Sequence, residues 1–187
     1  MTRGSSTTDP ILEAHGDRVD SRVAGLAGLP AGPELAAALA DLDVAKLSDW
    51  ELVEVLRARY RQASHDRGQL FAVLCEVTRR WQEQAMLRPE DPAWAWASSE
   101  VAAALVLSRG GADALCGLAW DLEDRLPEVG KALAAGVLDE PRARVFSDWT
   151  TWLDTAHAQA IVDVLLPKAP RLTTAQLRRE IAKHAIA

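Results

Sequence analysis

Helix start and stop signals follow one another from Ser98 to Thr173 with very little loop between them, and this density constrains the fold more than any other feature. Ser98 or Ser99 can cap a helix that is apolar on almost every side, so we expect that helix to be buried. Ser108 can cap a second helix after a tight turn. The stretch predicts a helix-turn-helix-like hairpin, and no segment shows the alternation that is typical of a strand.

The chain after the hairpin carries further helix signals. Pro127 suits the first turn of a helix, and Gly136 is placed for a left-handed C-cap at its end. Asp139 begins the next helix, and Asp154 begins another that stops before Pro167. The expected core face of this last helix consists of Ala160, Ile161, Val164 and Leu165.

Two capping boxes mark the starts of the longest and the final helix. Ser48 and Glu51 form an S-x-x-E box, and Thr173 and Gln176 form a T-x-x-Q box. Gly68 weakens the helix that covers residues 49–84, so one long bent helix, which we favour, and two helices both fit the pattern. The expected core face of this region consists of Leu52, Leu56, Tyr60, Ala63, Leu70, Val73, Leu74, Val77 and Trp81.

The domain organisation follows from length and composition. Residues 1–32 are rich in Ser, Thr, Gly, Asp and Pro and are expected to form a mobile N-terminal arm. Residues 33–187 are long enough for a single helical domain with one core. Its first helix starts at Pro33, and residues 87–96, with two prolines, are expected to be an extended connection. We predict an all-α, multi-helix bundle of about seven or eight helices.

Charge and apolar patterning exclude several classes of protein. The net charge of −6 argues against indiscriminate binding to nucleic acid, although residues 171–187 contain four Lys and Arg against one Glu. No apolar run is long enough to cross a membrane, and the N-terminus lacks a secretory signal, so a cytoplasmic location is expected. Cys75 and Cys116 have no metal-ligand spacing and are interpreted as buried apolar residues.

Four segments in a fixed order resemble a known family. They are LSDWELVEVLRA, SSEVAAALVLSRGGADAL, LPEVGKALAAGVLDEPRARV and LPKAPRLTTAQLRREI, within residues 47–187. Together they resemble the domain of unknown function 222, the N-terminal part of actinobacterial thirteen-E-twelve repeat proteins, in which an HNH endonuclease domain usually follows. The resemblance implies an association with mobile elements and with DNA cleavage by that partner domain.

The resemblance does not imply catalysis by this chain. An HNH site needs two histidines and an asparagine around a divalent metal on two strands and a helix. The four histidines are His15, His65, His157 and His184, which lie in the expected arm and on expected helices. We therefore expect the nuclease domain, a catalytic residue, a metal and any other cofactor to be absent.

Three clusters invite a catalytic or binding interpretation that a structural one outweighs. Ser64-His65-Asp66 has the residue types of a hydrolase triad, but consecutive residues on a helix point about 100° apart, which favours a solvated patch. A metal site is the weaker interpretation of one acidic cluster, since it lacks loop-type spacing; its members are Asp121, Glu123, Asp124 and Glu128. The hairpin has few base-reading side chains, so a scaffold is favoured over a DNA reader.

The strongest candidate interface is basic and lies at the end of the chain. Its residues are Arg171, Arg178, Arg179 and Lys183, joined by Arg142 and Arg144 and with His184 as a further candidate. Such a helix can contact phosphates and position a nuclease domain, and the alternative is a solvated face that complements the helix dipole. The predicted function is a non-catalytic accessory module that assists DNA engagement. The alternative is protein interaction or homo-oligomerisation through the helix after Ser48, and Trp149 with Trp152 is a second candidate for a partner interface.

Overall fold

The computed structural model describes residues 21–86 and 93–186, which contain nine α-helices and no strand, so the all-α prediction is confirmed. The helices are α1 (Ser21–Gly25), α2 (Pro33–Ala40), α3 (Asp49–Met86), α4 (Ala93–Leu105), α5 (Arg109–Asp124), α6 (Pro127–Ala134), α7 (Glu140–Thr150), α8 (Thr155–Leu165) and α9 (Thr174–Ile186). Three 3-10 turns join them, at Leu26–Gly28, Val44–Lys46 and Ala169–Arg171.

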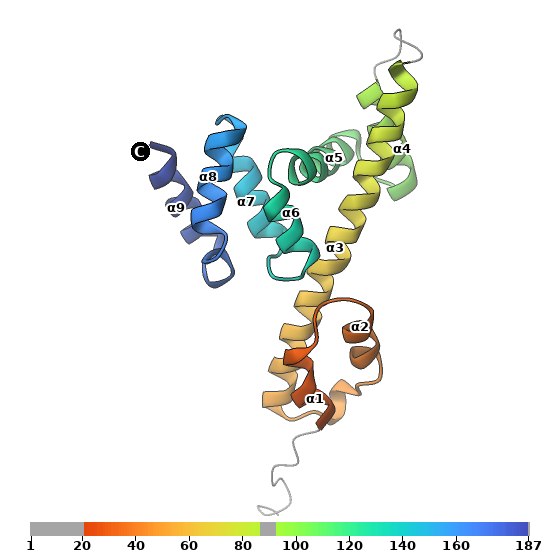
Figure 1. The fold of residues 1–187 in the computed structure, drawn as a ribbon. Helices are drawn as coiled ribbons and strands as arrows, with labels where there is room; N and C mark the ends of the chain where they lie inside the picture. Colours follow the sequence, from red (N-terminus) through yellow and green to blue (C-terminus); the bar gives the residue numbers. More distant parts are fainter. Residues whose placement is uncertain (1–20, 87–92, 187) are drawn as a thin grey trace, which may run out of the picture.

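The long helix α3 packs against α1, α2, α4, α5 and α6, while α8 and α9 lie away from it (Figure 1). It is one helix of 38 residues, so the favoured alternative for residues 49–84 is confirmed. Gly68 serves a close contact here and does not break the helix. A Cβ at Gly68 would lie 2.6 Å from the Cα of Ala134 at the end of α6, so only glycine lets the two backbones approach this closely.

Two hydrophobic cores are buried along α3, where one was expected. The smaller core lies between α1, α2 and the first half of α3, and it contains Val23 and Leu26. Arg61 of α3 donates to the carbonyl oxygen of Leu26 at 2.7 Å, and the side chain of Gln62 accepts from the backbone N–H of Gly32 at 2.8 Å. Residues 21–32 therefore belong to the folded structure and not to an arm, while residues 1–20 lie outside the described residues.

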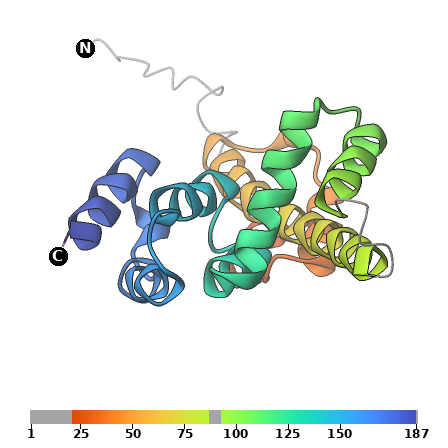
Figure 2. The ribbon, with the colours of Figure 1, turned by 90° about the horizontal axis from the view of Figure 1, so that it is seen from above.

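The larger core is centred on α5, which packs against α3, α4, α6 and α7. Seen from above, α5 lies between α4 on one side and α7 on the other (Figure 2). The predicted apolar stripe of α5 is buried as expected: Ala112, Leu115, Cys116, Ala119 and Leu122. Phe146 of α7 and both Leu177 and Ile181 of α9 complete this core.

The helix starts predicted from capping residues are confirmed for α3, α5, α7 and α9. The Ser48 N–H donates to the Glu51 carboxylate at 2.8 Å, and Ser108 accepts from the N–H of Gly111 at 3.1 Å. Asp139 accepts from the N–H of Arg142 at 2.9 Å. The box of Thr173 and Gln176 forms in the same way. Gly136 has a φ of 70°, which is the left-handed C-cap predicted after α6.

Several predicted core faces are wrong. In the first half of α3 the expected residues Leu52, Leu56, Tyr60 and Ala63 are exposed. The side that packs against α1 and α2 instead carries Val55 and Ala58, which are small enough for close approach. In α8 the expected core residues Ala160 and Val164 are exposed, while Ile161 and Leu165 are buried. Helical period alone does not tell a core face from an uncovered apolar face.

The hairpin of α4 and α5 differs from its prediction at its start. α4 begins at Ala93, inside the segment expected to be extended, and Ser98 lies within the helix, fully buried, rather than at its cap. The end of α4 is exposed, so it is not buried on every side. The helices bend by 113° around Val106, which has a φ of 54°. Across residues 21–86 and 93–186, no single helix is long and apolar enough to cross a membrane; α4 with α5 reaches that composition only as a bent pair.

Candidate nucleic-acid interface

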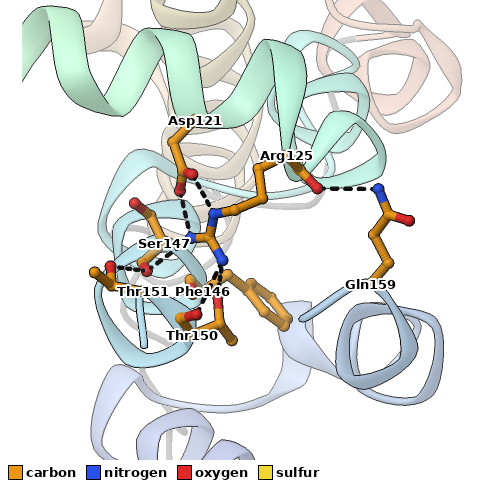
Figure 3. Close-up of polar contacts among 7 residues, drawn as sticks. All are labelled: Asp121, Arg125, Phe146, Ser147, Thr150, Thr151 and Gln159. Carbon is orange, nitrogen blue, oxygen red and sulfur yellow. Dashed lines mark hydrogen bonds and ion pairs between the residues drawn. The ribbon is translucent and has the colours of Figure 1, made fainter. Parts of the chain in front are cut away.

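Arg125, the C-cap residue of α5, connects α5 to the helices that follow it (Figure 3). Its guanidinium donates to both carboxylate oxygens of Asp121, at 2.5 and 2.8 Å. It also donates to the last carbonyls of α7, those of Ser147 at 3.1 Å and Thr150 at 3.0 Å. Gln159 of α8 donates to the carbonyl of Arg125 at 3.1 Å. The Arg125 side chain thus joins α5 to the C-terminal end of α7, where helix carbonyls lack their usual donors. The Arg125 backbone carbonyl joins α5 to α8.

Arg142 fixes α9 to α7 and does not present its charge to solvent. Its Nε donates to the carbonyl of Leu172 at 2.7 Å, and its guanidinium also pairs with Asp139. Asp139 is buried, caps α7 and accepts from the hydroxyl of Tyr60 at 2.8 Å. Arg142, a predicted DNA contact, therefore holds the start of the basic helix in place.

Arg144 lies in a second ion-pair network on α7. It donates to Glu140 at 2.9 Å, and Arg67 of α3 donates to the other oxygen of Glu140 at 2.5 Å. Burial raises the pKa of Glu140, but the hydrogen bonds from Arg67 and Arg144 outweigh it, so the pKa lies below its ordinary value. Arg144 is partly exposed and internally paired, which distinguishes it from the arginines of α9.

The basic residues of α9 lie on the side that faces away from the core. Leu177 and Ile181 are fully buried, while Arg178 and Arg179 are exposed and form no ion pair with any residue that the structure describes. Lys183 is exposed and pairs with Glu180 at 2.6 Å. The structure thus places Arg178, Arg179 and Lys183 on one helix, with a buried apolar face that holds it against α7.

Two further cations lie in the turn before α9. Arg171 ends the 3-10 turn and is exposed, as is Lys168 just before that turn. Lys168 was not among the predicted residues, but its charge contributes to lowering the pKa of Glu180, after the larger effects of Lys183 and His184. The sequence feature that could have identified Lys168 is its position between Pro167 and Pro170, since these prolines favour a turn just before α9.

Each side chain of Ser64-His65-Asp66 contacts a different partner. Ser64 donates to the carbonyl of Tyr60 at 3.0 Å, and His65 Nδ1 lies 2.5 Å from the carbonyl oxygen of Ala134. Asp66 accepts from Gln62 at 2.8 Å. These side chains do not form a catalytic chain. Ser64 is buried and His65 half-buried, so the patch is less solvated than predicted.

Two members of the acidic cluster have ion-pair partners, and of the two cysteines predicted to be buried, Cys116 is buried and Cys75 is half-buried. Asp121 pairs with Arg125, and Glu128 pairs with Lys131 at 2.7 Å. In the part of the chain that the structure describes, no group of three or more metal-ligating side chains lies together. Burial raises the pKa of the Cys75 thiol to about 11, which is typical of an unreactive cysteine.

The hairpin helix α5 is unsuited to reading bases. Arg109 is exposed at its start, but six of its residues are buried in the larger core. Its exposed side carries Glu123 and Asp124, whose charge repels phosphates. The scaffold interpretation of the hairpin fits this packing.

Comparisons with known proteins place the chain in a family without assigning an activity. The family model of a domain of unknown function, DUF222, matches residues 56–186. No curated protein and no solved structure matches the chain. The match covers both networks that fix α7, together with all of the basic residues of α9 that the sequence singled out.

Proposed function

We propose that this chain, which belongs to the DUF222 family of unknown function, is a non-catalytic module. In this proposal it binds the DNA backbone through α9 and positions an HNH endonuclease domain there. The observation that carries the proposal is the pair Arg178 and Arg179. Both are exposed and lack an ion-pair partner among the described residues, on a helix whose start is held by Arg142. Cations on a rigid element can contact phosphates without reading sequence.

The charge distribution supports this surface over any other. From Lys168 to the end of the chain there are five Lys and Arg against Glu180 alone, in a protein with a net charge of −6. Many arginines elsewhere are neutralised locally; Arg57, Arg79 and Arg80 of α3, for example, all pair with glutamates of the same helix. The field that attracts a polyanion is therefore strongest around α9.

The nuclease part of the proposal rests on the four segments that resemble the region before HNH domains. Their most specific residues are now explained by packing: Asp139 and Arg142 join α7 to the start of α9. The absence of catalysis by this chain is supported by the different partners of Ser64, His65 and Asp66. The module thus supplies a rigid, charged platform for another domain's chemistry.

Binding to a fluorescein-labelled duplex of about 25 base pairs, measured by anisotropy at low salt, tests the proposal. We expect the triple variant Arg178→Ala, Arg179→Ala, Lys183→Ala to bind at least about tenfold more weakly than the unchanged chain. The matched control removes three cations from α3, with Arg57→Ala, Arg79→Ala and Arg80→Ala. Equal losses in the two triple variants, or no binding by the unchanged chain, would show that α9 is not the interface.

A second function, self-association through α3, is favoured by one observation. Leu52, Leu56 and Tyr60 recur every four residues on one side of α3, with exposed fractions of 40, 67 and 54%. A stripe of this kind is typical of helices that pack against another helix. We propose that a second copy of the chain covers it.

Light scattering coupled to gel filtration separates the two functions. Self-association predicts a mass that rises with concentration and returns to that of a monomer in Leu56→Glu. Val73→Glu is the matched control, because Val73 is also exposed, by 60%, but lies about 25 Å farther along α3 than Leu56. A monomer at all concentrations would exclude this function and leave the DNA proposal unaffected.

A further inference from the structure

An open groove runs between α8 and the last turn of α9, which lie next to each other (Figure 1). It has a volume of about 410 Å³. The wall from α8 repeats at i, i+3, i+4 and i+7, so it is one face of the helix. The lining residues are Leu153, His157, Ala160, Ile161 and Val164 on the α8 side and His184 and Ala185 on the α9 side.

α8 is apolar on two sides, and the described residues cover one of them. Ala158, Val162 and Leu165 are buried in the larger core. Ala160 and Val164 were expected to be buried too, but both are exposed, Val164 by 45%. A helix that is apolar on two sides is typical of a position between two packed layers. Here the second layer is not supplied by residues 21–86 or 93–186.

The charged residues near the groove indicate which kind of partner would bind there. From residue 145 to residue 167 the chain has three aspartates and no lysine or arginine. Asp148 and Asp163 are exposed and form no ion pair with any described residue. Asp154 pairs with His157 at 2.6 Å, and both are exposed. The α8 side of the groove therefore belongs to a segment with aspartates and no lysine or arginine, and its α9 side is lined by His184 and Ala185.

Two exposed indoles lie close in the sequence to the lining residue Leu153. Trp152, 65% exposed, directly precedes the lining residue Leu153, and Trp149 is 40% exposed one turn earlier. Indole rings attract Lys and Arg side chains through their negative faces. Apolar lining, aspartates without cationic partners and exposed indoles all favour a cationic, amphipathic partner over an acidic one.

We infer that the groove between α8 and α9 binds a basic amphipathic helix of a partner protein. The partner's apolar face lies on Ala160 and Val164, as in other helix-in-groove complexes, and its flanking Lys or Arg side chains meet Asp163, which directly precedes Val164 on α8. This inference does not rest on the DNA proposal, because the two use different residues and partners of opposite charge. A chain that binds DNA through α9 retains this groove.

A pair of designed peptides tests the inference on the full chain. Each has about 18 residues with Leu at i, i+3, i+4 and i+7, and the remaining positions are all Lys in one peptide and all Glu in the other. Titration calorimetry is expected to show the Lys peptide binding at least about tenfold more tightly than the Glu peptide. Val164→Arg is expected to weaken the Lys peptide about tenfold or more. Val137→Arg, at a site 58% exposed outside the groove, is expected to leave it unchanged.

Asp163→Lys gives a second test that does not depend on the apolar lining, since Asp163 is exposed and its replacement does not disturb the core. It is expected to weaken the Lys peptide several-fold while circular dichroism is unchanged. Equal binding of both peptides, no binding of either, or equal effects of Val164→Arg and Val137→Arg would overturn the inference. A dimer of the unchanged chain that Val164→Arg dissociates would also overturn it, because the occupant would then be a second copy.

Discussion

Replacing Arg125 by methionine keeps the length of the side chain and removes every hydrogen bond of its guanidinium. The change leaves the Asp121 carboxylate without its partner and removes the guanidinium donors from the carbonyls of Ser147 and Thr150. Those two carbonyls keep the Thr151 hydroxyl and the Leu153 N–H as donors. Both charged side chains are mostly buried, at 16 and 18% exposed. Solvent therefore replaces little of what is lost.

The expected loss follows from these contacts. Removing one partner of a buried ion pair costs about 3–5 kcal/mol of unfolding free energy, because the remaining charge stays buried. A domain of ordinary stability has about 5–15 kcal/mol in total. Arg125→Met should therefore lower the free energy of unfolding by about 3 kcal/mol or more, while Arg125→Lys, which keeps the charge but not the fork, should lose less.

Urea unfolding followed by circular dichroism measures this loss. The matched control is Arg79→Ala, because Arg79 pairs with Glu76 and Glu83 on the surface of α3 and is 50% exposed. Surface pairs of this kind contribute at most about 1 kcal/mol. Equal losses for Arg125→Met and Arg79→Ala would refute the conclusion that the Arg125 side chain fixes α5 to α7.

Three further predictions concern single positions. Gly68→Ala should lower the unfolding free energy by about 2 kcal/mol in urea titrations, because its Cβ would lie 2.6 Å from the Cα of Ala134; an unchanged midpoint would contradict this. Val106→Gly should raise the melting temperature by about 2 °C in calorimetry, since a branched residue is strained at a φ of 54°; a fall would show that the strain is absent. Glu140 has a lowered pKa in the folded state, so the stability that its carboxylate contributes is present above its unfolded pKa of about 4.3 and is lost as the pH falls through the folded pKa. Glu140→Gln should therefore reduce the dependence of unfolding free energy on pH at acid pH, and an unaltered dependence would contradict this.

Local signals in the sequence predicted the helix boundaries well. Ser48, Ser108 and Asp139 form their caps because a cap depends only on residues within one turn. Gly136 ends α6 in the left-handed conformation for the same local reason. These features are set by the backbone of a few neighbouring residues, so a single sequence is sufficient to locate them.

The buried faces and the roles of the arginines could not be predicted in the same way. Leu56 and Val164 have the periodicity of core residues, but burial depends on whether another element covers them. Arg142 was a candidate DNA contact, and the sequence did not single out Arg125. The carbonyls to which they donate, those of Ser147 and Leu172, lie 22 and 30 residues away in the sequence. A charge count does not distinguish a guanidinium that caps a distant helix from one that faces solvent.

The candidate DNA interface is consequently narrower than its prediction. Arg142 and Arg144 have partners within the fold, while Arg178 and Arg179 are exposed without them. Arg142 is expected to affect DNA binding only indirectly, through the placement of α9, and Arg144 through its ion-pair network on α7. Arg178 and Arg179 should contact phosphates themselves.

The salt dependence of DNA binding tests the central proposal most directly. Each phosphate contact contributes about 0.9 to the slope of log affinity against log salt. The variant Arg178→Ala, Arg179→Ala, Lys183→Ala should therefore show a slope smaller by about 3, while the control triple variant of α3 keeps the slope of the unchanged chain. An identical slope in all three proteins would contradict the proposal that α9 neutralises phosphates.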